Sequence, residues 1–200
     1  MPRKILEYDD FGLGLSWVLD EAMQRTSHAL VADGRVWFVD PVDVGEAMDR
    51  AAALGEPAGV IQLLDRHNRD CAQIAERLGV PHLRLPDAID GSPFELLKVV
   101  DLPKWRERAL WWPAERMLVV SEAVGTGPMF RSGDVPAGIH MFLRLHPPGV
   151  LKRYEPEHLL CGHGDSIHGP DAADALRIAY KRSLRDLPGT IARLPKLARG

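Results

Sequence analysis

The first half of the chain alternates between the apolar spacing of strands and that of helices. Two apolar runs, Ala29–Ala32 and Arg35–Asp40, flank the dipeptide Asp33-Gly34. These two residues readily adopt the positive φ angles that a tight hairpin turn requires. A helix is expected next, because Asp43-Val-Gly-Glu46 has the spacing of a capping box and apolar residues follow at helical spacing. The pattern therefore predicts a hairpin followed by a helix.

A strand–helix–strand unit comes next. The uninterrupted apolar run Gly59–Leu64 is typical of a strand that is covered on both faces. Helical spacing from about Asp70 to Leu78 stops at Gly79, a favoured residue just past the end of a helix. Val80–Leu85 then has the composition of a further strand.

The second half consists mainly of predicted strands and closes with one long helix. That helix begins at Pro170, a position where the missing N–H of proline costs nothing. The order of elements predicts a layered α/β domain, and we expect residues 1–200 to form a single one. The predicted strands are Leu96–Leu102, Glu107–Trp112, Arg116–Ser121 and Glu157–Cys161, and His140–Leu145 fits either a strand or a helix.

Composition and charge limit which binding partners and which cellular compartment we expect. The formal net charge of −3 and the scattered basic residues argue against nucleic acid, which needs clustered Lys and Arg. Apolar runs stay far below the roughly 20 residues of a membrane-spanning helix. The two cysteines, Cys71 and Cys161, suit a reducing compartment, so we expect a cytoplasmic protein. Trp105, Trp111 and Trp112 suit either the core or a subunit interface, which leaves a homodimer open.

Three segments, taken in order, resemble the metallo-β-lactamase superfamily. The first, Leu63-Leu-Asp-Arg-His-Asn-Arg-Asp-Cys71, follows a predicted strand and opens a helix, as the family's His-x-His-x-Asp-His loop does. The second runs from Ala109 to Glu122 and is similar to the hairpin that ends in Gly-Asp. The third, Leu159-Leu-Cys-Gly-His-Gly-Asp-Ser-Ile167, is similar to the strand that ends in Gly-His-Gly. The resemblance implies a four-layer αββα sandwich, an α/β (α+β) fold.

The resemblance is weaker for the metal ligands than for the scaffold. In the family, seven loop side chains hold two metal ions that provide a hydroxide nucleophile. When these seven positions are carried over, two are identical to the family, namely His67 and His163. Three are altered to the carboxylates Asp65, Asp70 and Glu122, and two, Arg69 and Pro103, cannot ligate a metal.

Arg69 is the most consequential replacement. An arginine stays protonated and cannot ligate a metal. At about 4 Å and an effective dielectric constant near 20, its repulsion of a divalent ion is roughly 8 kcal/mol. We therefore expect its guanidinium to replace the metal and to neutralise Asp65, Asp70 and Glu122.

Several residues keep a plain structural interpretation beside the functional one. His67 and His163 are either metal ligands or loop histidines that only form hydrogen bonds. Asp70 is equally well explained as a helix N-cap. Cys71 and Cys161 are either buried thiols or, next to one of these histidines, a nucleophile.

Three functions follow from the resemblance. The leading one is a degenerate, metal-free member without a cofactor, which binds an unidentified small molecule or protein in the old cleft. The alternative is a hydrolase of an ester, thioester or similar small substrate that uses one Zn, Mn or Fe ion. Its ligands would come from Asp70, Glu122 and His163, with His67 as a further candidate. A cysteine-based enzyme is the third, so the chain's enzymatic status is left open.

Overall fold

Two β-sheets form the centre of the computed structural model, which describes residues 3–67 and 69–188. The first sheet has the order β1-β2-β3-β4-β5-β6. Its first four strands are antiparallel to their neighbours, and β5 and β6 continue it in parallel. The strands are β1 (Ile5–Asp10), β2 (Gly14–Leu19), β3 (Thr26–Ala32), β4 (Arg35–Val39), β5 (Glu56–Gln62) and β6 (His82–Arg84).

The second sheet has the order β13-β12-β9-β8-β7. Only the central pair β12 and β9 is parallel, and the other neighbours are antiparallel. A small two-stranded sheet, β10 and β11, lies beside it. The strands are β7 (Glu95–Leu102), β8 (Trp105–Trp112), β9 (Met117–Val120), β10 (Val124–Gly125), β11 (Gly138–Ile139), β12 (His158–Cys161) and β13 (Ile167–His168).

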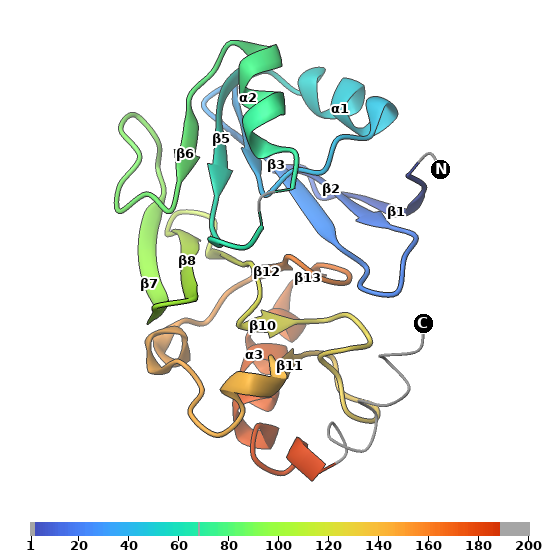
Figure 1. The fold of residues 1–200 in the computed structure, drawn as a ribbon, viewed down its shortest axis with the longest axis vertical. Helices are drawn as coiled ribbons and strands as arrows, with labels where there is room; N and C mark the ends of the chain where they lie inside the picture. The colour runs from blue at the N-terminus through green and yellow to red at the C-terminus, as the bar shows by residue number, and fades with distance from the viewer. Residues whose placement is uncertain (1–2, 68, 189–200) are drawn as a thin grey trace.

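The α-helices cover the outer faces of the two sheets (Figure 1). Helices α1 (Gly45–Ala52) and α2 (Cys71–Leu78) lie on the first sheet, and α3 (Pro170–Arg182) lies on the second. Two 3₁₀ helices, η1 (Met141–Leu143) and η2 (Gly149–Arg153), connect elements of the second half.

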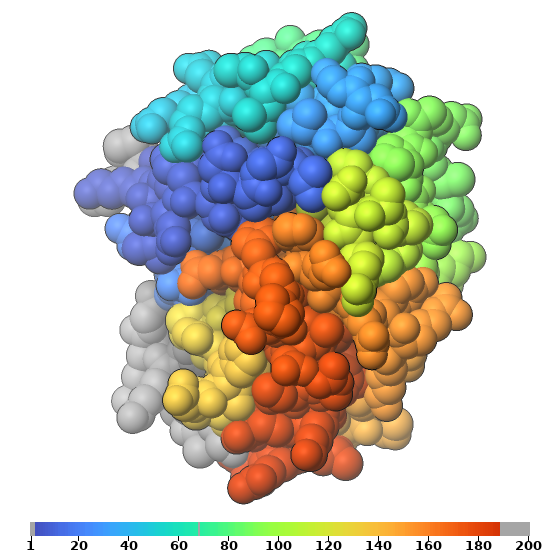
Figure 2. All heavy atoms as spheres, turned by 180° about the vertical axis from the view of Figure 1, so that it is seen from behind, coloured from blue at the N-terminus to red at the C-terminus, as the bar shows by residue number. Residues whose placement is uncertain are grey.

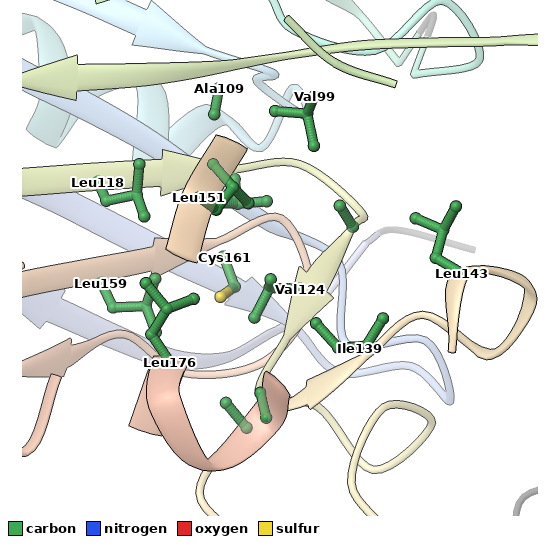
Figure 3. Packing of buried hydrophobic residues seen from close by; sticks show 14 of the residues in the cluster. Val99, Ala109, Leu118, Val124, Ile139, Leu143, Leu151, Leu159, Cys161 and Leu176 are labelled. Atoms are coloured by element: carbon green, nitrogen blue, oxygen red, sulfur yellow. The ribbon is translucent and has the colours of Figure 1, made fainter. Parts of the chain in front are cut away.

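Three apolar clusters separate four layers. The first lies under α1 and α2 and joins Phe38 of the first sheet to Ile74 of α2. A second lies between the sheets, where Trp37 and Ile61 share a cluster with Leu110. The third fills the space between the second sheet and α3, as Leu118, Leu159 and Leu176 show in Figure 3. This layering is the αββα sandwich that the resemblance implied.

Several sequence-based expectations are confirmed at the residue level. Asp33 and Gly34 form the turn between β3 and β4, with φ of 51° and 73°. Gly79 ends α2 with φ of 66°, the left-handed conformation that glycine adopts without steric cost. The last helix begins at Pro170 as predicted.

One expectation was wrong and one open alternative is decided. Helix α1 begins at Gly45 after the N-cap Val44, and Asp43 pairs with Arg77 at 2.5 Å instead of capping. The segment His140–Leu145, which fitted either a strand or a helix, contains the short 3₁₀ helix η1, and His140 accepts the N–H of Phe142 at its start. The two N-terminal strands were not predicted at all.

The N-terminal strands lie against the C-terminal half. Figure 2 shows the blue N-terminal segment directly beside the orange region of β12, β13 and the start of α3. Asp9 of β1 accepts a hydrogen bond from His168 of β13 at 2.8 Å, which ties the halves together. Within the described residues, no helix is long and apolar enough to cross a membrane.

Candidate metal centre

Four loops meet at one edge of the sandwich. Strands β4 and β5 are parallel, and so are β9 and β12. In each pair, the two strands therefore end at the same edge of their sheet. Asp40, His67, Glu122 and His163 lie on the loops that follow these four strands.

His67, Glu122 and His163 come together at this edge. One ligand atom from each lies within 4.8 Å of the others, and the two imidazole rings are 5.5 Å apart. The His163 side chain is almost fully buried, and 14% of the Glu122 side chain is exposed. The three side chains thus form a group of electron-pair donors, of which Glu122 is the most exposed.

The tautomer of His163 follows from its hydrogen bond. Its Nδ1 lies 3.0 Å from the carbonyl oxygen of Met23, and a carbonyl only accepts, so Nδ1 carries the proton. The lone pair is therefore on Nε2, which is buried and has no hydrogen-bond partner among the described residues. Burial and, next, the charge of Arg69 lower the pKa of His163 to about 3, so the ring is neutral.

His67 is oriented in the same way by a carboxylate. Its Nδ1 donates to Asp40 Oδ2 at 3.2 Å, and Asp40 is fixed in turn by Ser121 Oγ at 2.5 Å and Leu63 N at 3.0 Å. Burial, followed by the charge of Arg69, lowers the pKa of His67. A carboxylate behind an imidazole is the usual support of a metal-ligating histidine.

Two glycines let His163 reach the site. A side chain at Gly162 would place its Cβ 2.3 Å from the carbonyl oxygen of Ser121. Gly164 has φ of 85°, and a Cβ there would lie 2.2 Å from Gly127 N. The Gly-His-Gly sequence is therefore required by the close approach of neighbouring backbone segments.

Buried Glu107 holds the loop that carries Glu122. Its Oε1 accepts the N–H groups of Glu122 and Ala123 at 2.8 and 2.9 Å, and its Oε2 accepts Trp105 Nε1 at 3.1 Å. Burial raises the pKa of Glu107 to about 7, against the effect of these donors. At the surface, Glu122 pairs with Arg66 at 2.7 Å and lies 3.7 Å from His140 Nε2.

Arg69 corrects one sequence-based expectation. Among the described residues its guanidinium donates to backbone carbonyls: Nη1 to Thr26 and Asp40 at 2.5 and 2.6 Å, and Nη2 to Gly162 at 2.9 Å, while Nε has no partner there. We had expected it to neutralise Asp65, Asp70 and Glu122, but it pairs with none of these carboxylates in the described contacts. The cation is held at the junction of three loops by oxygens that carry no formal charge.

The carboxylates assigned to Arg69 have other partners. Asp65 accepts the backbone N–H of Arg106 at 2.9 Å. Asp70 pairs with Arg3 and accepts Asp43 N at 2.8 Å, so it stands outside the group of His67, Glu122 and His163. Asp70 does occupy the N-cap of α2, but its side chain caps none of the described N–H groups of that helix.

Solved structures of other proteins share this arrangement of sheets. The metallo-β-lactamase DIM-1 aligns with a TM-score of 0.58 at 13% identity, covering 92% of this chain and 98% of its own. A metallo-β-lactamase from Pontibacter korlensis aligns with a TM-score of 0.60 at 10% identity, covering 89% and 99%. This chain has the metallo-β-lactamase fold. A putative diflavin flavoprotein fragment from Nostoc sp. PCC 7120 also shares it, with a TM-score of 0.59 at 13% identity over 94% and 98%.

No protein-family model matches the sequence, and no curated protein does. The likeness is therefore one of fold, and the chemistry has to be argued from the side chains.

Within the metallo-β-lactamase fold, the residues fit one metal ion. Two neutral imidazoles and a carboxylate are a donor set that Zn, Mn and Fe all accept. The orphaned, buried Nε2 of His163 is the observation that tests the fit, because a metal would satisfy its lone pair. Pro103 lies in the turn between β7 and β8 and can contribute no ligand.

The cysteines do not support a thiol-based site. Both are free and buried. Burial raises the pKa of Cys161 to about 12 and raises that of Cys71 further, so neither is a thiolate at neutral pH.

Sequence reasoning missed four residues of the site. Asp40, Arg66, Glu107 and His140 each touch His67 or Glu122 through the contacts described above. Glu107 left no clear signal, because in the strand Trp105–Trp112 it stands between Arg106 and Arg108 and resembles an ordinary charged residue. The others are ordinary polar residues of loops until the fold brings them together.

Proposed function

We propose that the chain binds one divalent metal ion through His67, Glu122 and His163 and hydrolyses a small ester or thioester. The buried lone pair of His163 Nε2 carries this proposal. A buried acceptor without a partner is costly, and a ligand atom of His163 lies within 4.8 Å of ligand atoms of His67 and Glu122.

A single ion is proposed because Arg69 occupies the place of a ligand to the second. Its guanidinium is enclosed by the carbonyls of Thr26, Asp40 and Gly162 and cannot leave without stranding them. A second divalent ion beside this cation would meet strong repulsion.

A bound ion would supply Lewis-acid polarisation of the substrate carbonyl and a water nucleophile at neutral pH. His140 lies at the rim, where its Nε2 is 3.7 Å from Glu122 and its side chain is 16% exposed. Burial lowers the pKa of His140, so the ring is neutral near pH 7. Its Nδ1 accepts the N–H of Phe142, so Nε2 carries the proton and can donate it toward Glu122. Glu107 keeps the backbone of Glu122 in place.

One observation favours the metal-free binding protein as a second candidate. Arg66 already neutralises Glu122, as a built-in cation would in a site that holds no metal. This arginine is 44% exposed, however, so the ion pair is readily exchanged. The two candidates make opposite predictions for metal dependence.

The test is hydrolysis of a panel of chromogenic esters and thioesters by metal-loaded protein. We expect activity that a chelator removes and added metal restores, and that His163→Ala abolishes. His146→Ala, at an exposed histidine outside the site, is the matched control and should behave as the parent. Activity that survives chelation or the His163→Ala change would refute the proposal.

A further inference from the structure

A shallow pocket adjoins the candidate metal centre. It has a volume of about 470 Å³ and is formed by Arg66 together with the turn between β7 and β8. Its floor is apolar, and Leu102 exposes 54% of its surface there. The lining residues are Arg66, Leu102, Pro103, Lys104 and Trp105.

Arg66 links this pocket to the metal centre. Its Nη2 donates to Glu122 Oε2 at 2.7 Å, and its guanidinium lies 4.3 Å from the centre of a ring of Trp105. Trp105 also contacts His140, with ring centroids 4.7 Å apart. Two residues that line the pocket, Arg66 and Trp105, therefore contact Glu122 and His140 at the candidate metal centre.

We propose that this pocket binds the acyl chain of the substrate, with the acyl carbonyl at the Arg66 end. The inference rests on the proposed hydrolase function and names its substrate class: an ester or thioester of an apolar aliphatic acid. Water oxygen bonds to the acyl carbon, the C–O or C–S bond breaks, and the alcohol or thiol leaves with a proton. The product is an aliphatic carboxylate and one further proton.

The charges of the pocket match that product. A guanidinium presents several donors in one plane and binds carboxylates well, and only Nη2 is engaged by Glu122 in the described contacts. Stacking on Trp105 holds the guanidinium plane in position. Lys104 adds a second cation at the pocket wall, while Leu102 and Pro103 offer apolar surface to a chain.

Binding of the product can be measured without metal. The NMR signals of the tryptophan indole N–H groups are followed while the protein is titrated with hexanoate. The chain has five tryptophans, and the signal of Trp105 is assigned with Trp105→Phe. We expect hexanoate to shift the Trp105 signal selectively, and to bind about tenfold more tightly than uncharged hexan-1-ol. Equal binding of the two, or shifts spread over all five indoles, would overturn the proposal.

A charge placed in the pocket provides the matched test. Leu102→Asp should weaken hexanoate binding about tenfold, because it removes apolar surface and adds a like charge. Leu6→Asp changes a leucine of similar exposure, 49%, on the edge strand β1 and should leave binding unchanged. Equal weakening by both variants, or none by Leu102→Asp, would refute the acyl pocket.

These outcomes are separable from those of the proposed function. If zinc binds to His67, Glu122 and His163 but hexanoate does not shift Trp105, the pocket assignment fails and the metal centre stands. If hexanoate binds in the pocket but no metal binds, the hydrolase proposal fails, and with it the catalytic part of this inference.

Discussion

The same loops build two adjacent regions of opposite chemistry. In one, His67, Glu122 and His163 bring electron-pair donors within 4.8 Å of one another. In the other, the guanidinium of Arg69 is surrounded by three backbone carbonyls at 2.5 to 2.9 Å. Asp40 belongs to both, because its carboxylate orients His67 and its carbonyl binds Arg69.

We infer from this difference that a cation built into the chain can take the place of one metal ion on this fold. A cation that is part of the chain satisfies the loop carbonyls permanently, whereas a metal ion does so only when bound. The positive charge of Arg69 also acts on the neighbouring region. After burial, it is the second-largest cause of the lowered pKa values of His28, His67 and His163. Neutral imidazoles are the form that ligates metal, and the same positive field also opposes a divalent ion, which limits how many can bind.

Removal of Arg69 should have the largest effect. Arg69→Met leaves the carbonyls of Thr26, Asp40 and Gly162 without this donor, and we expect a loss of about 4 kcal/mol in the free energy of unfolding. Urea unfolding measures it. Arg177→Met, at an exposed arginine paired with Asp174 on α3, should change the free energy by less than about 0.5 kcal/mol. Similar small losses in both variants would mean that the guanidinium is not a structural cation.

Acid should destabilise the metal-free protein through its buried histidines. The pKa of His28 is lowered from 6.5 to about 4, so the unfolded chain binds a proton below pH 6.5 that the folded chain does not. Stability is therefore complete above pH 6.5 and falls as the pH drops toward 4, by roughly 3 kcal/mol from His28 alone. Urea unfolding at a series of pH values tests this. Stability that is constant from pH 7 to pH 4.5 would contradict it.

Asp40→Asn should affect chiefly the proposed metal ligands, because the backbone carbonyl that binds Arg69 is unchanged. An amide can present its N–H to His67 Nδ1, which would move the ring proton to Nε2 and remove the lone pair from the site. We expect zinc affinity to fall about 10- to 100-fold. Asp33→Asn, in the exposed β3–β4 turn, is the control because asparagine accepts the same positive φ. Calorimetric titration would show unchanged affinity in both variants if Asp40 does not orient His67.

The smallest effect is expected at the rim. Arg66 competes with a metal ion for Glu122, but its ion pair is exposed and worth less than about 1 kcal/mol. Arg66→Gln should therefore tighten zinc binding about threefold. Arg84→Gln, at an arginine that donates to the carbonyl of Asp65, serves as the control. Weaker zinc binding in Arg66→Gln would show that Arg66 supports the site instead of competing for it.

Local patterns predicted much of the fold. The Asp33-Gly34 turn, the end of α2 at Gly79 and the start of α3 at Pro170 each depend on the conformational preference of one or two residues. The capping box failed because Asp43 found a partner 34 residues away, in Arg77, and that contact is invisible to local sequence.

The site was harder to predict for the same reason. His67, Glu122 and His163 could be named because the resemblance supplied their positions. The partners of Arg69 could not, since backbone carbonyls of Thr26, Asp40 and Gly162 carry no residue-type signal. Because Asp65, Asp70 and Glu122 lie near Arg69 in the resemblance, the sequence favoured a metal-free site in which Arg69 pairs with them. The structure does not support that pairing.

The central claim is that this edge of the sandwich binds one metal ion and excludes a second. Metal-stripped protein titrated with zinc and with manganese, followed by calorimetry and native mass spectrometry, tests it most directly. We predict one ion per chain with a submicromolar Kd, lost in His163→Ala and kept in His146→Ala. Binding of no ion would restore the metal-free interpretation, and binding of two would show that Arg69 does not exclude the second.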